Sequence, residues 1–147
     1  KSVFFEKNSQ LKSIENYSFQ DCFFKNISIP SSVTYIGEFA FSSGLQLNDV
    51  SFSDDSDLRV IEKGAFSTTS LKSFCVPSNV NSIGKFAFNR LMGIIEVNPK
   101  LMSFNLDAIT DSSSPSNKPK VAIMVPANMK VIFTKKTNTI TLYHYKT

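Results

Sequence analysis

Apolar residues return in the same arrangement several times along the chain. The stretch 71–88, LKSFCVPSNVNSIGKFAF, contains two apolar patterns joined by a turn at Pro77. The first pattern ends with apolar residues two positions apart, at Phe74 and Val76, which is the period of a strand with one buried face. The second pattern, 80–88, reads V-x-x-I-G and ends in A-F. Neither pattern can bury its apolar side alone, so we expect copies of this unit to pack on one another.

The second pattern starts again every 21 to 28 residues, which indicates a repeat architecture. The apolar pair of the first pattern recurs in step with it and is followed by Pro30, Pro77 and Pro126 in three copies. Proline cannot donate a hydrogen bond to a sheet, so it closes each of these strands. We therefore expect one strand per repeat, stacked about 4.8 Å from the next in a parallel sheet. The repeats start at Leu11, Val33, Leu58, Val80, Leu101 and Met129.

The motif in 27–41, ISIPSSVTYIGEFAF, resembles the BspA-like leucine-rich repeats of bacterial and protozoan surface proteins. The resemblance covers about residues 11–132, although Gly44 and Thr69 stand where the family motif has the cysteine that Cys22 supplies. It implies a leucine-rich-repeat solenoid, mainly β, with a parallel sheet and short helical turns. It also implies an extracellular or cell-surface location and a non-enzymatic module that binds proteins, extracellular matrix or glycans, as in adhesion. A structural spacer without a ligand of its own is the alternative.

We expect the whole chain, 1–147, to form a single solenoid domain. Its parts would be an N-terminal cap or array edge at 1–10, five to six repeats at 11–132, a loop insertion at 110–119 and a C-terminal cap at 133–147. The V-x-x-I-G segment is expected to return as a second short strand. Open sheet edges at the ends of such an array would allow self-association.

The repeat predicts which side chains fill the interior. Phe41, Phe66 and Phe88 occupy the same place in successive repeats and should stack in one column. Glycine is the residue that most easily adopts a tight backbone bend, and we expect such bends after the second strand. The glycines at these positions are Gly37, Gly64 and Gly84.

The two cysteines are expected to remain free thiols. Cys22 and Cys75 lie two repeats apart, which separates them by at least about 9.6 Å, more than a disulfide can span. Cys22 should face the core and Cys75 the open side of the sheet. A nucleophilic cysteine also needs a base beside it, and the only histidine, His144, lies near the other end of the chain. We therefore expect no enzymatic activity.

The sequence gives no reason to expect a cofactor or metal. One histidine and two separated cysteines cannot supply the four ligands of a zinc site. The run of Asp54, Asp55 and Asp57 lacks the glycine and closing glutamate of a calcium loop, so a solvated turn is favoured. No glycine-rich phosphate loop is present.

The net charge of +4 comes mainly from the C-terminal part, where no acidic residue follows Asp111. We favour a solvated face over a nucleic-acid site, since the phenylalanines occupy core positions instead of stacking positions. No apolar run reaches the roughly 18 residues that would predict a transmembrane segment.

The candidate binding face is the outward side of the repeat strands, because solenoids bind partners along such surfaces. Its apolar members Ile94, Ala122 and Met124 could form a contact patch or could be covered by the loop 110–119. Asn16 and Asn26 match the pattern of glycan acceptors, and a glycan on Asn26 would block that end of the face. The candidate face comprises Asn26, Ser28, Asp49, Ser51, Ser73, Cys75, Ile94, Glu96, Ala122 and Met124.

Overall fold

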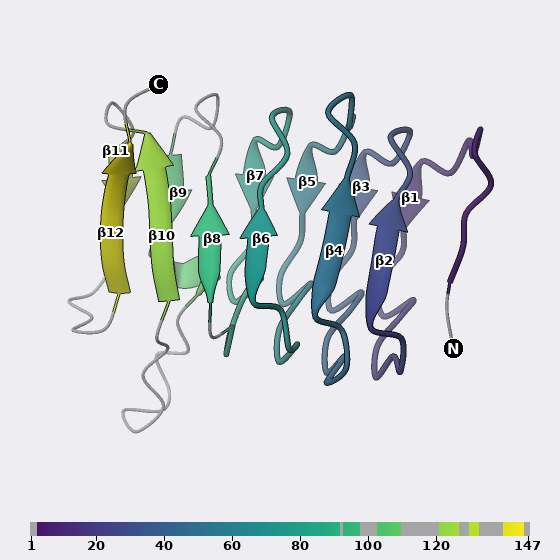
Figure 1. The fold of residues 1–147 in the computed structure, drawn as a ribbon, viewed down its shortest axis with the longest axis horizontal. Helices are drawn as coiled ribbons and strands as arrows, with labels where there is room; N and C mark the ends of the chain where they lie inside the picture. Colours follow the sequence, from purple (N-terminus) through teal and green to yellow (C-terminus); the bar gives the residue numbers. More distant parts are fainter. Residues whose placement is uncertain are drawn as a thin grey trace.

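The protein is a parallel β-solenoid in which each lap of the chain adds one strand to each of two walls (Figure 1). The computed structural model describes residues 3–91, 93–97, 103–109, 121–126, 130–132 and 140–145. Every strand pair in these residues is parallel, and the paired strands come from successive laps. The expected parallel sheet with one strand per repeat is confirmed.

The longer strands form what we call the front wall. They are β2 (Asn26–Ile29), β4 (Asp49–Phe52), β6 (Ser73–Cys75), β8 (Ile94–Glu96), β10 (Val121–Pro126) and β12 (Ile140–Tyr145). Hydrogen bonding divides this wall into the pair β2-β4 and the four-stranded sheet β6-β8-β10-β12. The two sheets still continue one another, because β4 and β6 lie in contact.

The V-x-x-I-G segments form the back wall, as the repeat predicts. Its strands are β1 (Ser13–Ile14), β3 (Tyr35–Ile36), β5 (Val60–Ile61), β7 (Ser82–Ile83), β9 (Ser103–Asn105) and β11 (Lys130–Ile132). The first four make one sheet, and β9 pairs with β11 in another. In Figure 1 these strands lie behind the front wall and run in the opposite direction.

The expected short helical turns are largely replaced by a third wall of hydrogen-bonded turns. Within the described residues the one helix is η1 (Leu106–Ala108), a 3₁₀ turn of 3 residues. At the other corners, alternate N–H groups donate to carbonyls of the next lap: Phe39 to Lys63 at 3.0 Å, Phe41 to Ala65 at 2.8 Å and Ser43 to Ser67 at 2.9 Å. The first and last donors of each set have positive φ, for example 53° at Phe39 and 59° at Ser43.

The positive φ values at these corners could not be predicted from the residue types. A positive φ costs an L-residue about 1–2 kcal/mol, so a phenylalanine there is unexpected. Six of these residues donate one hydrogen bond to the adjacent lap, and a buried N–H left without a partner would cost about as much; they are Tyr17, Asp21, Phe39, Ser43, Thr68 and Phe86. The apolar A-F pattern identifies which side chains point inward but carries no information about φ.

The glycines that recur in the repeat serve two different purposes. Gly64 has a φ of +65°, so the expected tight bend is confirmed there. At Gly37 and Gly84 the backbone of the preceding lap occupies the space that a Cβ would need. A Cβ on Gly37 would lie 2.6 Å from the backbone nitrogen of Asn16, and one on Gly84 would overlap the backbone nitrogen of Lys63. Neither glycine has a positive φ, so the bend itself does not require glycine there; glycine allows two laps to approach closely.

The predicted aromatic column forms the centre of the core. Phe41 stacks on Phe66 with ring centroids 5.1 Å apart and planes within 3°, and Phe66 stacks on Phe88 at 5.9 Å. Phe19 extends the column at 5.2 Å from Phe41. Phe74, from the front wall, contacts both Phe66 and Phe88 at an angle. Inward residues of both walls surround this column, and most are fully buried.

The N-terminal segment covers part of the first lap. Val3 and Phe5 pack against the core, and the Ser32 hydroxyl donates to the carbonyls of Ser9 and Leu11 at 2.8 Å each. At the other end β12 pairs with β10 along its whole length. The expected loop 110–119 and most of the expected cap at 133–147 lie outside the described residues. No helix in the described part is long and apolar enough to cross a membrane.

We predict that Phe66→Ala lowers the free energy of unfolding by about 3–5 kcal/mol, because it opens a cavity between two stacked rings that neither neighbour can fill. Urea denaturation followed by circular dichroism measures this loss. Phe23→Ala is the matched control, since Phe23 is 71% exposed and its removal should cost less than about 0.5 kcal/mol. Equal effects of the two substitutions would contradict a core built on this column.

Candidate functional site

The outward side chains of the front wall form two parallel rows. The first row begins with Asn26 opposite Asp49, and the second begins with Ser28 opposite Ser51. Because all strands are parallel and in register, each later lap adds one side chain to each row. The first row continues through Ser73, Ile94 and Ala122, and the second through Cys75, Glu96 and Met124.

The structure places the candidate residues on one face. The eight from β2 to β8 are exposed, whereas Ala122 and Met124 are half-buried. The loop 110–119, which could cover the apolar end, lies outside the described residues. Exposure makes these side chains accessible to a partner, and their role in binding remains a prediction.

Tyr143 belongs to this face although the sequence analysis did not include it. It pairs with Met124 and is 55% exposed. The alternating pattern of 140–145 could have revealed it, because placing that strand beside β10 brings Tyr143 into the second row. With Ile94 and Met124, Tyr143 makes the C-terminal end of the face apolar and aromatic.

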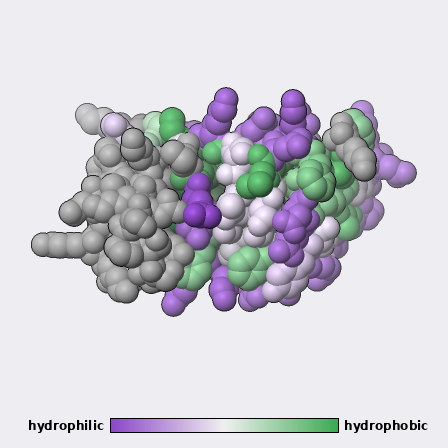
Figure 2. All heavy atoms as spheres, turned by 90° about the horizontal axis from the view of Figure 1, so that it is seen from below, coloured by the Kyte–Doolittle hydropathy of each residue, from purple (hydrophilic) through white to green (hydrophobic). Residues whose placement is uncertain are grey.

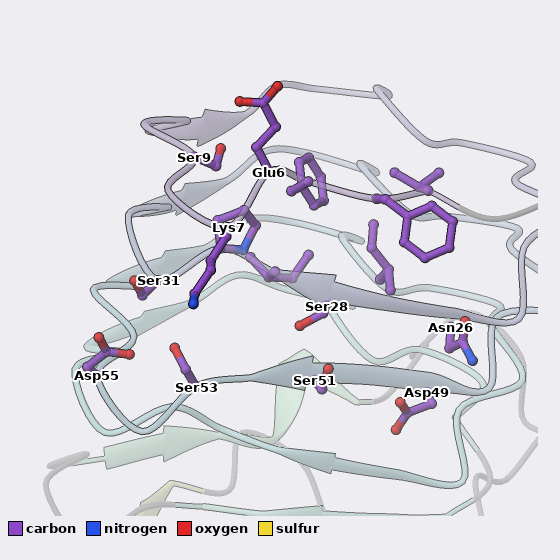
Figure 3. A pocket seen from close by; sticks show the side chains of 16 residues that line it. Glu6, Lys7, Ser9, Asn26, Ser28, Ser31, Asp49, Ser51, Ser53 and Asp55 are labelled. Carbon is purple, nitrogen blue, oxygen red and sulfur yellow. The ribbon is translucent and has the colours of Figure 1, made fainter.

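The opposite end of the face is hollowed. A cavity of about 610 Å³ lies between the N-terminal segment and the outward side of β2 and β4; we call it the N-terminal hollow. Figure 3 shows Asn26 and Ser28 along β2 and Asp49 and Ser51 along β4, which together make its floor. At one end the loops that follow these strands contribute Ser31, Ser53 and Asp55, and on one side lie the N-terminal residues Val3, Phe4, Phe5, Glu6, Lys7 and Ser9.

The hollow exists because its floor is built from small side chains. Ser28 and Ser51 open the second row, and the later members Glu96, Met124 and Tyr143 are much larger. The N-terminal segment supplies the side wall, since Val3 and Phe5 are packed against the core and hold it beside β2. The sequence analysis expected a cap at residues 1–10, but it did not place this segment beside β2, because it aligned the repeats only from Leu11 onward.

The hollow has both positive and negative groups. Asp49 and Asp55 bring carboxylates to it, and Lys7 extends across it toward the loops of Ser53 and Asp55 (Figure 3). The side chain of Glu6 points away from the two strands in the same view. The site therefore offers acceptors from the carboxylates, donors from the ammonium group, and hydroxyls that do both.

In the described part of the chain, the side of the solenoid that carries the turns before the front strands shows no continuous apolar surface. Phe23 and Leu45 are exposed there, and Figure 2 shows hydrophobic residues in separate clusters divided by hydrophilic ones. Tyr17 stacks on Phe39 at 5.7 Å, and the Lys63 ammonium lies 5.7 Å from the centre of the Phe39 ring. The exposed apolar side chains on this side are thus either scattered or engaged in contacts within the protein.

The two cysteines are free, as predicted. Cys22 is half-buried and packs against the core, while Cys75 is exposed on the front wall. Partial burial, and then the carboxylate of the neighbouring Glu96, raise the pKa of the Cys75 thiol. Burial is also the main cause that raises the pKa of Cys22. Both thiols are therefore poor nucleophiles at neutral pH, because the thiolate is the reactive form.

The glycan-acceptor asparagines lie in different settings. Asn16 accepts a hydrogen bond from the N–H of Glu38 at 2.8 Å through its side-chain oxygen, which ties it to the next lap. Asn26 is exposed and lines the hollow.

Among the described residues, no group of three or more His, Cys, Asp or Glu side chains could hold a metal ion. The side chain of His144 lies outside the described part.

These walls, stacked cores and recurring motifs define a leucine-rich-repeat β-solenoid. Residues 1–115 match the BspA type leucine rich repeat region in 6 copies. The chain therefore belongs to the BspA type leucine-rich-repeat family.

Two solved structures share the fold. One is a leucine rich cell surface protein from Faecalibacterium prausnitzii, with a TM-score of 0.63 and 21% identity over 93% of this chain. The other is a leucine-rich repeat protein from Bacteroides ovatus, with a TM-score of 0.55 and 21% identity over 92% of this chain. The chain spans 34% and 41% of the lengths of these two proteins. Comparison with curated proteins gives no match.

We predict that Glu96→Gln speeds alkylation of Cys75 by iodoacetamide at pH 8, because removing the carboxylate lowers the pKa of the thiol and increases the thiolate fraction. The effect should be less than about tenfold, since burial remains the larger cause. Mass spectrometry of the labelled peptides measures both cysteines in one sample, so Cys22, which is remote from Glu96, is the internal control. A slower or unchanged rate at Cys75 would show that Glu96 does not act on it.

Proposed function

We propose that this chain is a non-enzymatic binding module of a surface or secreted protein, engaged in adhesion or host interaction through its front wall. The supporting observation is the row structure of the wall, which presents side chains from successive laps as one accessible surface. Repeat proteins commonly use extended surfaces of this kind for binding. The likeness to a leucine rich cell surface protein supports the location.

The chemistry of the front wall favours a protein or extracellular-matrix partner, with or without glycans. Ile94, Met124 and Tyr143 supply apolar and aromatic contact area, and Glu96 lies among them. Interfaces are enriched in aromatic residues and methionine, whereas nucleic-acid sites need clustered cations. We propose neither a nucleic-acid partner nor a cofactor for this face.

Introducing two arginines on the front wall, Ser73→Arg with Glu96→Arg, should weaken adhesion to cells or immobilised matrix by about tenfold or more, because it places desolvated charge in the contact. The matched control, Ser82→Arg with Glu62→Arg, makes the same charge change on the back wall and should have little effect. Surface plasmon resonance on matrix extracts and flow cytometry on cells measure the difference.

Two results would contradict the proposal. Equal loss of binding in both variants would show that net charge, and not the front wall, controls it. Absence of binding by the wild-type chain to every cell type and extract would favour the spacer function instead. Thermal unfolding of each variant confirms that the fold is intact before binding is compared.

A further inference from the structure

We propose that the N-terminal hollow is a carbohydrate subsite that takes a neutral sugar. This inference rests on the proposed binding function and assigns a ligand class to one end of the same face. It is carried by the combination of a hollow of about 610 Å³, a floor of short polar side chains and an exposed phenylalanine at its side.

The floor offers the hydrogen-bonding groups that suit hydroxyls. A sugar hydroxyl donates one hydrogen bond and accepts others, so it needs acceptors and donors side by side. The Asp49 carboxylate accepts, the Asn26 amide does both, and the Ser28 and Ser51 hydroxyls do both. All four side chains are exposed on adjacent, in-register strands, so one sugar ring can reach several of them at once.

Phe4 supplies an apolar platform beside these polar groups. It lines the hollow and is 88% exposed, although the neighbouring Val3 and Phe5 are packed against the core. A phenylalanine presented to solvent by an anchored segment can stack on the C–H face of a pyranose ring, while the hydroxyls of the ring's edge meet the floor. Burial of the phenylalanine ring and of the C–H face of the sugar then contributes binding free energy in addition to that of the hydrogen bonds.

The charges of the hollow argue against an anionic ligand. Among the described residues that line it, Asp49 and Asp55 face the hollow and Lys7 is the one basic side chain, so sulfate, phosphate or carboxylate groups would meet net negative charge. A polypeptide is also disfavoured. The serine floor offers no pocket for the large side chains that anchor protein interfaces. A neutral polyhydroxylated ligand is not repelled by the carboxylates and needs no pocket for a large side chain.

The first experiment screens the chain on a printed array that carries neutral, sialylated and sulfated oligosaccharides. The protein is produced in a host without N-glycosylation, so that no glycan on Asn26 fills the hollow. We expect neutral oligosaccharides to bind and their sialylated or sulfated counterparts to bind at least about tenfold more weakly. An array on which no neutral oligosaccharide binds, or on which acidic ones bind best, would overturn the proposal.

Calorimetric titration with the strongest neutral oligosaccharide then locates the site. Ser51→Arg fills the floor of the hollow and should weaken binding about tenfold or more, and Phe4→Ala should weaken it several-fold. Ser82→Arg adds the same side chain at an exposed position on the back wall, outside the binding face, and should leave affinity within about twofold. Equal effects of Ser51→Arg and Ser82→Arg, or none from either, would place sugar binding elsewhere and overturn the assignment.

Failure here can be distinguished from failure of the proposed function. If the array stays silent while binding to cells or matrix is still lost in the Ser73→Arg, Glu96→Arg variant, the carbohydrate subsite is wrong and the front-wall function stands. If neither assay detects binding, both are wrong. Unfolding curves of Ser51→Arg and Phe4→Ala exclude loss of fold as the cause, since both positions are exposed.

Discussion

The fold depends on the hydrogen bonds that join each corner turn to the same corner of the next lap. At each of the first three corners, three N–H groups donate across the gap, and two of the three donors are held at positive φ to do so. A lap of different shape would lose these bonds and leave its strained residues uncompensated. This constraint keeps successive laps congruent, and congruent laps bring Phe41, Phe66 and Phe88 into one column.

Congruent laps also determine the surface. When every lap has the same path, the outward residues of the front strands fall into straight rows, and the character of a row depends only on which residues occupy it. In the second row the side chains grow from Ser28 and Ser51 to Met124 and Tyr143. One scaffold thereby offers a polar hollow at one end and an apolar surface at the other, without any change in backbone geometry.

Much of this arrangement could be predicted from the sequence, because repeated positions place equivalent residues in equivalent environments. The period placed Phe66 between Phe41 and Phe88 and placed Cys75 outside. The corners could not be predicted as they are, since nothing about a phenylalanine indicates positive φ at Phe39. The side wall of the hollow was expected only as a cap at residues 1–10, because its position beside β2 follows from the tertiary packing of Val3 and Phe5.

The same reasoning explains why membership of the family does not name a ligand. The repeat motif specifies the residues that fill the inner slots, that close the strands and that allow neighbouring laps to approach, such as Gly37 and Gly84. The outward positions of the front strands lie between the motif positions and are free of those packing requirements. Two proteins of this family can therefore share every structural residue and differ at each outward side chain. Binding specificity in this fold has to be sought in the outward rows and in the N-terminal segment that borders them, which are the two parts of the chain that form the N-terminal hollow.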